Sequence, residues 1–177
     1  MSCPRPAAAR RLEEHPEWEI GQIVSAAEEL TRRSRVCFIP DELEYLRAGG
    51  RVSNAVALCG KLLGIHPRIE LLDSQLVATK KLRGKMARLA PSLVEEFAAQ
   101  EHLERDELWL VWTPGFPDEL RVPVEESAKR CGFQRVTWMK ARGVITTHGG
   151  PAAFGVAGFE VERIFADRGN TTLISWA

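Results

Sequence analysis

The chain has 177 residues, which is enough for one domain with a substantial core. Hydrophobic residues make up 45% and charged residues 27%, and 24 Lys and Arg balance 24 Asp and Glu. This zero net charge argues against a general nucleic-acid binder, which needs a basic surplus, and no apolar run is long enough for an integral membrane helix.

Apolar spacing and turn residues predict alternating helices and strands. We expect residues 1–16, which hold three prolines, to form a flexible segment, and residues 17–177 to form a single domain. In the first half of the chain we expect a helix from Glu17 to the basic run at Arg32, a strand over 36–39, a short helix over 41–48, a helix over 53–63 and a hairpin over 68–79. A helix from Met86 to Ala98, a strand over 108–112 and a helix restarted at Pro123 are expected next. The last expected elements are strands over 136–139 and 144–147, a helix over 151–158, and strands near 161–165 and 171–176. This mixture predicts an α/β or α+β mixed sheet with flanking helices.

The cysteines and the first residues indicate a cytoplasmic protein. The four cysteines are scattered without a CxxC pair, and three lie in apolar runs, so we expect buried, reduced thiols. The first residues lack the apolar stretch of a secretory signal. No group of His, Cys, Asp and Glu has the spacing of a metal site, so no metal is expected.

The segment from Thr147 to Pro151 is the first candidate ligand site. We expect an apolar strand to deliver His148 to Gly149 and Gly150, and Pro151 to begin a helix. The glycines permit close approach of a ligand, and a free helix start together with His148 favours a carboxylate or phosphate. The alternative is a tight turn in which His148 bonds a backbone carbonyl.

Two basic segments are further candidates for anion contacts. Arg51 follows a glycine pair, and Arg83 and Lys85 belong to a basic cluster between a strand and a long helix. A surface arginine and a solvated basic loop are the alternatives. No nucleotide-binding loop or nucleophile elbow is present.

Four segments together resemble the DegV family, which includes the fatty-acid-binding subunit of bacterial fatty acid kinase. They run from Asp41 to Ser53, Gly60 to Pro67, Arg83 to Lys85, and Thr147 to Pro151. The resemblance covers about residues 17–158 and only the C-terminal half of the family. The family's N-terminal domain, which supplies a serine to the fatty-acid carboxylate, has no match. A truncated or split form is therefore expected.

The resemblance implies an acyl carrier that is not itself an enzyme. It implies that His148, with Thr147, Gly149 and Gly150, holds the carboxylate of a long-chain fatty acid. Arg51, Arg83 and Lys85 would contact an acyl phosphate or the kinase subunit. No cofactor is implied, and His66 and Ala152 depart from the usual Lys and Gly. We expect His148, Arg51 and Arg83 to converge on one head group.

The absence of the N-terminal half leads us to expect weak or no fatty-acid binding by this chain alone. One alternative is a non-catalytic interaction module that has lost lipid binding and that forms a homo-oligomer or pairs with a complementing N-terminal half. Another is an independent enzyme with His148 as general base, although no nucleophile or metal partner is visible.

Overall fold

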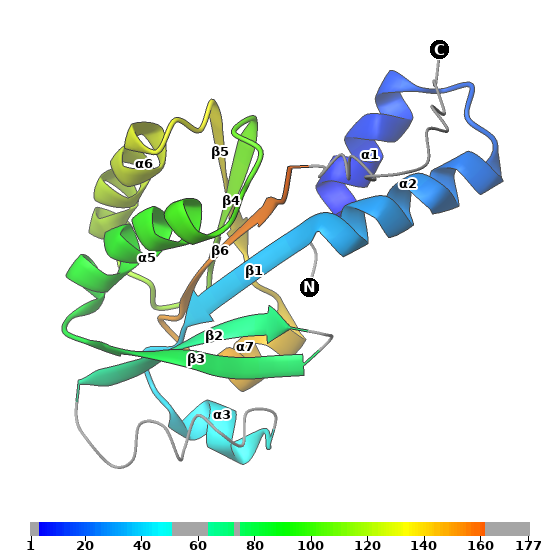
Figure 1. Cartoon of the computed structure of the whole chain (residues 1–177). Coiled ribbons are helices and arrows are strands. Elements are labelled where there is room, and N and C mark those ends of the chain that lie inside the picture. The colour runs from blue at the N-terminus through cyan, green and yellow to red at the C-terminus, as the bar shows by residue number, and fades with distance from the viewer. Residues whose placement is uncertain (1–3, 51–63, 73–74, 162–177) are drawn as a thin grey trace, which may run out of the picture.

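A computed structural model describes residues 4–50, 64–72 and 75–161, which form a six-stranded sheet with helices on both faces (Figure 1). The strands are β1 (Ser34–Ile39), β2 (Ile65–Leu72), β3 (Gln75–Arg83), β4 (Glu107–Trp112), β5 (Arg135–Lys140) and β6 (Phe154–Phe159). Their order is β3-β2-β1-β6-β4-β5, and every neighbouring pair is antiparallel except β4 and β5, which are parallel. The predicted mixed sheet with flanking helices is confirmed.

The helices divide between the two faces of this sheet. They are α1 (Pro4–Glu14), α2 (Ile20–Arg33), α3 (Glu44–Ala48), α5 (Met86–Gln100), α6 (Arg121–Arg130) and α7 (Gly143–Gly149), with a 3-10 turn over Asp118–Leu120. α5 and α6 pack together on one face, whereas α7 lies on the other face and contacts α3. α2 extends away from the sheet and continues directly into β1 (Figure 1).

The main core lies between the sheet and the pair of α5 and α6. The predicted apolar face of α5 is confirmed, because all of its members are buried: Met86, Leu89, Ala90, Leu93, Val94, Phe97 and Ala98. They pack with alternate residues of the strands, which point to the same face of the sheet, among them Cys37, Leu110 and Val156. Burial in this core raises the pKa of the Cys37 thiol to about 12.

The N-terminal segment differs from the loose stretch expected over residues 1–16. Residues 4–14 form helix α1, and its Ala7 and Ala8 pack with Leu30 and Trp109. The Ala, Arg and Glu content of this segment has high helix propensity, and prolines at residues 4 and 6 fall in the first turn, where they are tolerated. The prolines that suggested a loose segment are therefore compatible with a helix start.

An ion pair between a half-exposed arginine and a buried glutamate attaches α1 to the sheet. The Arg10 guanidinium donates to Glu107 at 2.6 Å, and Glu107 is 5% exposed. Burial acts to raise the pKa of the Glu107 carboxyl, but hydrogen bonds from Arg10 and Thr137 and the charges of Arg10 and Arg135 outweigh it and lower that pKa. Ionised Glu107 thus helps to hold α1 in place.

Two elements near residue 150 were predicted wrongly. The strand expected over 144–147 is helix α7, because the carbonyl of Arg142 accepts hydrogen bonds from the amides of Ile145 and Thr146 immediately after β5. The helix expected over 151–158 is instead the central strand β6, bonded to β1 and β4. Its small residues serve close packing, since a Cβ at Gly155 would lie 2.9 Å from the Phe38 Cβ. The β-branched residues of 144–147 favoured a strand where a helix forms, and the small residues of 151–158 favoured a helix where a strand forms.

Three further predictions cannot be compared with the structure. The helix over 53–63 and the strand near 171–176 lie outside the described residues, as does the strand near 161–165 apart from its first residue. In the parts of the chain that are described, no helix is long and apolar enough to span a bilayer.

Candidate functional site

A cavity of about 810 Å³ lies between α7 and the sheet face opposite α5 and α6. Its floor is formed by strand positions on the sheet face opposite the main core, including Phe38, Val111 and Gly155, which are partners in the sheet register. The residues that line it are Val36, Cys37, Phe38, Val111, Trp112, Thr113, Met139, Ala141, Arg142, Gly143, Val144, Ile145, Gly149, Ala153, Phe154 and Gly155. Nearly all are apolar, so the cavity suits a hydrophobic ligand.

The two glycine-containing segments singled out from the sequence meet where α3 contacts α7. A Cβ at Gly49 would lie 2.4 Å from Nδ1 of His148, and a Cβ at Gly150 would lie 2.7 Å from the Tyr45 ring. Gly150 also has a φ of 78°, a backbone conformation that residues with a side chain rarely adopt. Glycine at both positions therefore permits α3 and the His148 segment to pack directly on each other.

His148 lies at the C-terminal end of α7 and faces α3. It is half-buried, and its Nδ1 is buried without a hydrogen-bond partner among the described residues. Ile145 and Gly149 are one turn apart and line the cavity, whereas His148 is rotated about 100° from Gly149 around the helix. Thr147 is exposed, and Gly149 and Gly150 are buried.

The helix start that was to provide free N–H groups after Pro151 is absent, because the chain there forms a turn and then β6. The expected anion site at that helix N-terminus is therefore wrong in its local geometry. The motif instead forms the end of α7, where backbone carbonyls disfavour an anion unless donors or a cation compensate.

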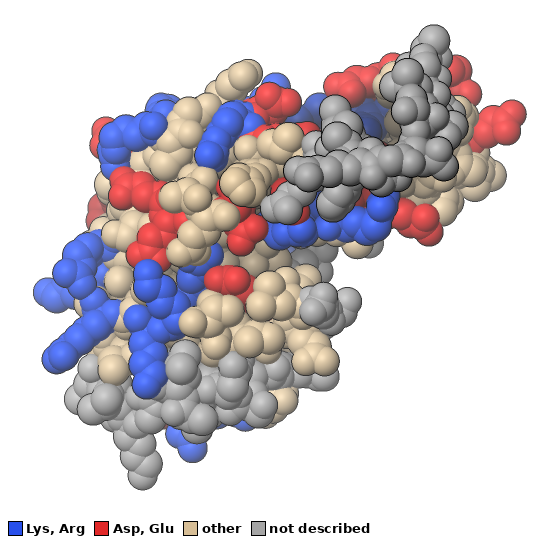
Figure 2. Space-filling model, viewed as in Figure 1, with Lys and Arg blue, Asp and Glu red and all other residues tan. Residues whose placement is uncertain are grey.

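The basic candidates lie elsewhere or outside the described residues. Arg51 lies outside the described residues. Arg83 ends β3, and Lys85 is the N-cap of α5; both are exposed. Figure 2 shows Lys and Arg side chains in blue over the turn from β3 to α5. Arg83 lines a second hollow of about 390 Å³ that shares no lining residue with the cavity under α7.

Arg142 was not identified from the sequence, although it lines the cavity. It is exposed, immediately precedes α7, and has the only charged side chain among the described residues that line this cavity. Its position as a lone cation between β5 and the His148 motif was the available signal. Spacing alone could not show which side of α7 it would occupy.

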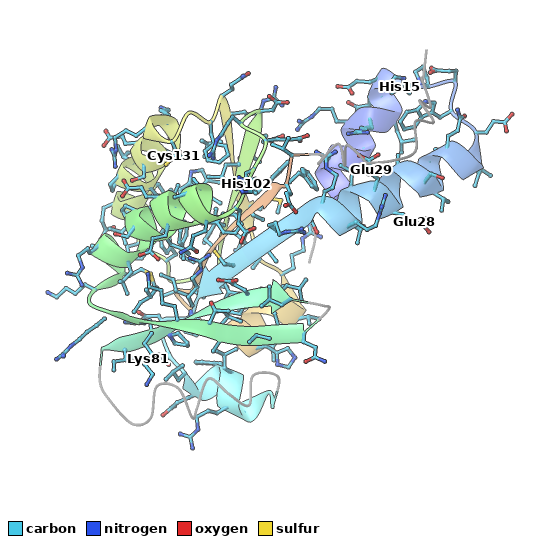
Figure 3. The ribbon with its side chains drawn as sticks, in the orientation of Figure 1. His15, Glu28, Glu29, Lys81, His102 and Cys131 are labelled. Carbon is cyan, nitrogen blue, oxygen red and sulfur yellow. The ribbon has the colours of Figure 1, made fainter. Side chains whose placement is uncertain are left out.

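The titratable residues form no metal centre within the described ranges, where no three His, Cys, Asp or Glu side chains gather. Figure 3 shows His15, His102 and Cys131 in separate parts of the molecule, on the loop after α1, the loop after α5 and the end of α6.

Known proteins are similar to this chain in sequence and in fold. The family model described as "Uncharacterised protein, DegV family" matches residues 7–161. A DegV domain-containing protein from Deinococcus radiodurans is 31% identical over 140 residues, which cover 78% of this chain and 49% of that protein.

Two solved structures have the same fold at low sequence identity. A DegV family protein from Eubacterium eligens, loaded with heptadecanoic acid, matches with a TM-score of 0.71 and 20% identity over 88% of this chain and 56% of that chain. The Fatty Acid Kinase (Fak) B3 protein of Streptococcus pneumoniae, loaded with linoleic acid, matches with a TM-score of 0.70 and 12% identity over 88% of this chain and 55% of that chain. The chain therefore spans about half the length of these relatives.

Proposed function

The chain belongs to the DegV family, and from this premise we propose that it binds a long-chain fatty acid, with the acyl chain in the cavity under α7. The observation that carries the proposal is the size and apolar lining of that cavity, since about 810 Å³ is within the range of roughly 300–1,000 Å³ usual for small-ligand sites. The heptadecanoic acid and linoleic acid bound by the two structural relatives supply the ligand class.

The driving force for this binding is burial of methylene groups against the sheet. Each fully buried CH₂ contributes about 0.8 kcal/mol, so even partial burial makes affinity rise with chain length. The half-buried side chains of Phe38, Val111 and Met139 offer the contact surface. A second domain or a separate polypeptide that covers this face, as in a complementing N-terminal half, would increase the burial.

In this proposal His148 holds the carboxylate at the junction of α7 and α3, with Thr147, Gly149 and Gly150 around it. The contact with Gly49 encloses Nδ1 of His148, which leaves Nε2 as the nitrogen that donates to the ligand. Gly149 joins this head-group position to the cavity, because it belongs to both the motif and the cavity lining.

The chain would present this carboxylate to a separate kinase subunit, which would supply the phosphoryl-transfer chemistry. The name of the Streptococcus pneumoniae relative supports this partner class. Arg83 and Lys85, with Arg51, would contact the kinase or the acyl phosphate, as guanidinium and ammonium groups suit anionic partners. The carrier would then be non-enzymatic and cytoplasmic.

Fatty-acid binding is tested by measuring the affinity of the full chain for saturated acids of increasing length. We expect affinity to rise with each added methylene and Val111→Phe, which fills the cavity, to abolish that rise. Val122→Phe is the matched control, because Val122 is 63% exposed on α6 and outside the cavity lining. The same measurement tests the sequence-based expectation of weak or no binding by this chain alone. Weak binding that rises with chain length supports the proposal, whereas an affinity independent of chain length, or no binding, would refute it.

A non-catalytic interaction module is the second candidate function. The observation that favours it is the apolar stripe of α2, whose Ile20 and Val24 are 80% and 50% exposed. Size-exclusion chromatography with light scattering tests it: self-association that Ile20→Gln weakens supports the module, whereas a monomer at high concentration counts against self-association through this stripe.

A further inference from the structure

Arg142 is the one charged residue that lines the proposed acyl cavity among the described residues. Its guanidinium makes no hydrogen bond or ion pair within the described part of the chain, although it adjoins an almost wholly apolar lining. The one other conventional polar side chain in that lining is Thr113. Its hydroxyl accepts a hydrogen bond from the amide of Ala153 at 2.8 Å and lies 3.5 Å from the Ala153 carbonyl, so it is already engaged.

A carboxylate brought to an apolar cavity requires compensation for the water that it loses. A histidine imidazole offers a single directional hydrogen bond, whereas a guanidinium is always charged and can bind both carboxylate oxygens. The carbonyl end of α7, where His148 lies, adds no positive charge. Among the described residues, the cation that lines the cavity is therefore Arg142.

The geometry of α7 allows Arg142 and the His148 motif to act on one head group. Ile145 and Gly149 mark the edge of α7 that faces the cavity, and Arg142 lines the same cavity at the beginning of this edge. The rise of 1.5 Å per residue puts Arg142 and Gly149 about 10 Å apart along the helix. The long arginine side chain can cover much of this interval.

We propose that Arg142 binds the carboxylate of the fatty acid from the cavity side of α7 and thereby selects acids over uncharged acyl compounds of the same length. This inference rests on the proposed function. It assigns the charge recognition to Arg142 and leaves His148 a directional hydrogen bond.

Paired ligands separate charge recognition from binding of the acyl chain. The affinities of the full chain for heptadecanoic acid and heptadecanol are measured at pH 7.5 and at two salt concentrations. We expect Arg142→Gln to weaken binding of the acid about tenfold and to leave binding of the alcohol unchanged. Arg142→Lys should retain part of the preference, and Arg32→Gln, which removes an exposed positive charge from α2, should retain all of it.

Several results would overturn the proposal. An Arg142→Gln variant that keeps the preference for the acid, or that weakens acid and alcohol equally, excludes charge recognition by this side chain. So does an Arg32→Gln variant with the same loss, because the effect would then be non-specific. A wild-type chain that binds both ligands equally contradicts the role of Arg142 while leaving acyl binding intact, and one that binds neither contradicts both proposals.

Discussion

Replacing Gly49 with alanine places a methyl group where the structure has the edge of His148. The new Cβ would lie 2.4 Å from Nδ1 of His148 and 3.3 Å from the carbonyl oxygen of Tyr45. Gly49 has a φ of −75°, so the backbone itself accepts alanine, which would stabilise the chain by about 0.5–1 kcal/mol without this contact. Overpacking costs about 1–3 kcal/mol, so we expect a net destabilisation of about 1 kcal/mol and a displaced imidazole.

Urea unfolding and the imidazole NMR signals of His148 measure the two effects. Gly50→Ala is the matched control: it introduces strain at a φ of 58° but meets no atom within 4 Å. It should lose about 1–2 kcal/mol while the His148 signals remain unchanged. A Gly49→Ala variant that is more stable than wild type and has unaltered His148 signals would refute the packing of α3 against α7.

The remaining predictions concern an ion pair and two thiols. Because the pKa of Glu107 is lower in the folded chain, its contribution to stability is present above its unfolded pKa of about 4.3 and is lost as the pH falls through its folded value. Glu107→Gln should flatten this part of the curve of unfolding free energy against pH, and an unchanged curve would contradict this prediction. Arg10→Ala should lower the free energy of unfolding by about 1 kcal/mol and expose α1 to limited proteolysis, and an unchanged digestion pattern would contradict that. Iodoacetamide labelling at pH 8, mapped by peptide mass spectrometry, should modify Cys131 before Cys37, since Cys37 is fully buried with a pKa raised to about 12; the reverse order would count against the core described.

The parts of the fold that could be predicted have strong local signals. The face of α5 repeats over its 15 residues, and the β2–β3 hairpin contains a turn signal between two apolar runs. The segment after residue 143 lacks such agreement. Val144 and Ile145 favour a strand, yet β5 remains an edge strand of the sheet and the chain turns into α7 instead. The glycines of β6 reflect contacts with residues distant in sequence, such as Phe38, which local spacing cannot reveal.

The candidate site could be predicted in composition more readily than in arrangement. The two glycine-containing segments do meet, through Gly49 and His148, because the glycines mark close approaches of the backbone. The direction in which His148 points depends on α7 being a helix, so an expected strand gave no means of relating it to Arg142. The contribution of Arg51 stays a prediction.

The position of β6 has a consequence for synthesis on the ribosome. About 115 residues separate the end of β1 from the start of β6, yet these strands are neighbours at the middle of the sheet. Synthesis proceeds at roughly 5–20 residues per second, so β1 is completed about 6–23 s before the ribosome reaches β6. During that interval the growing polypeptide exposes an open strand edge, which makes it a candidate client for cotranslational chaperones.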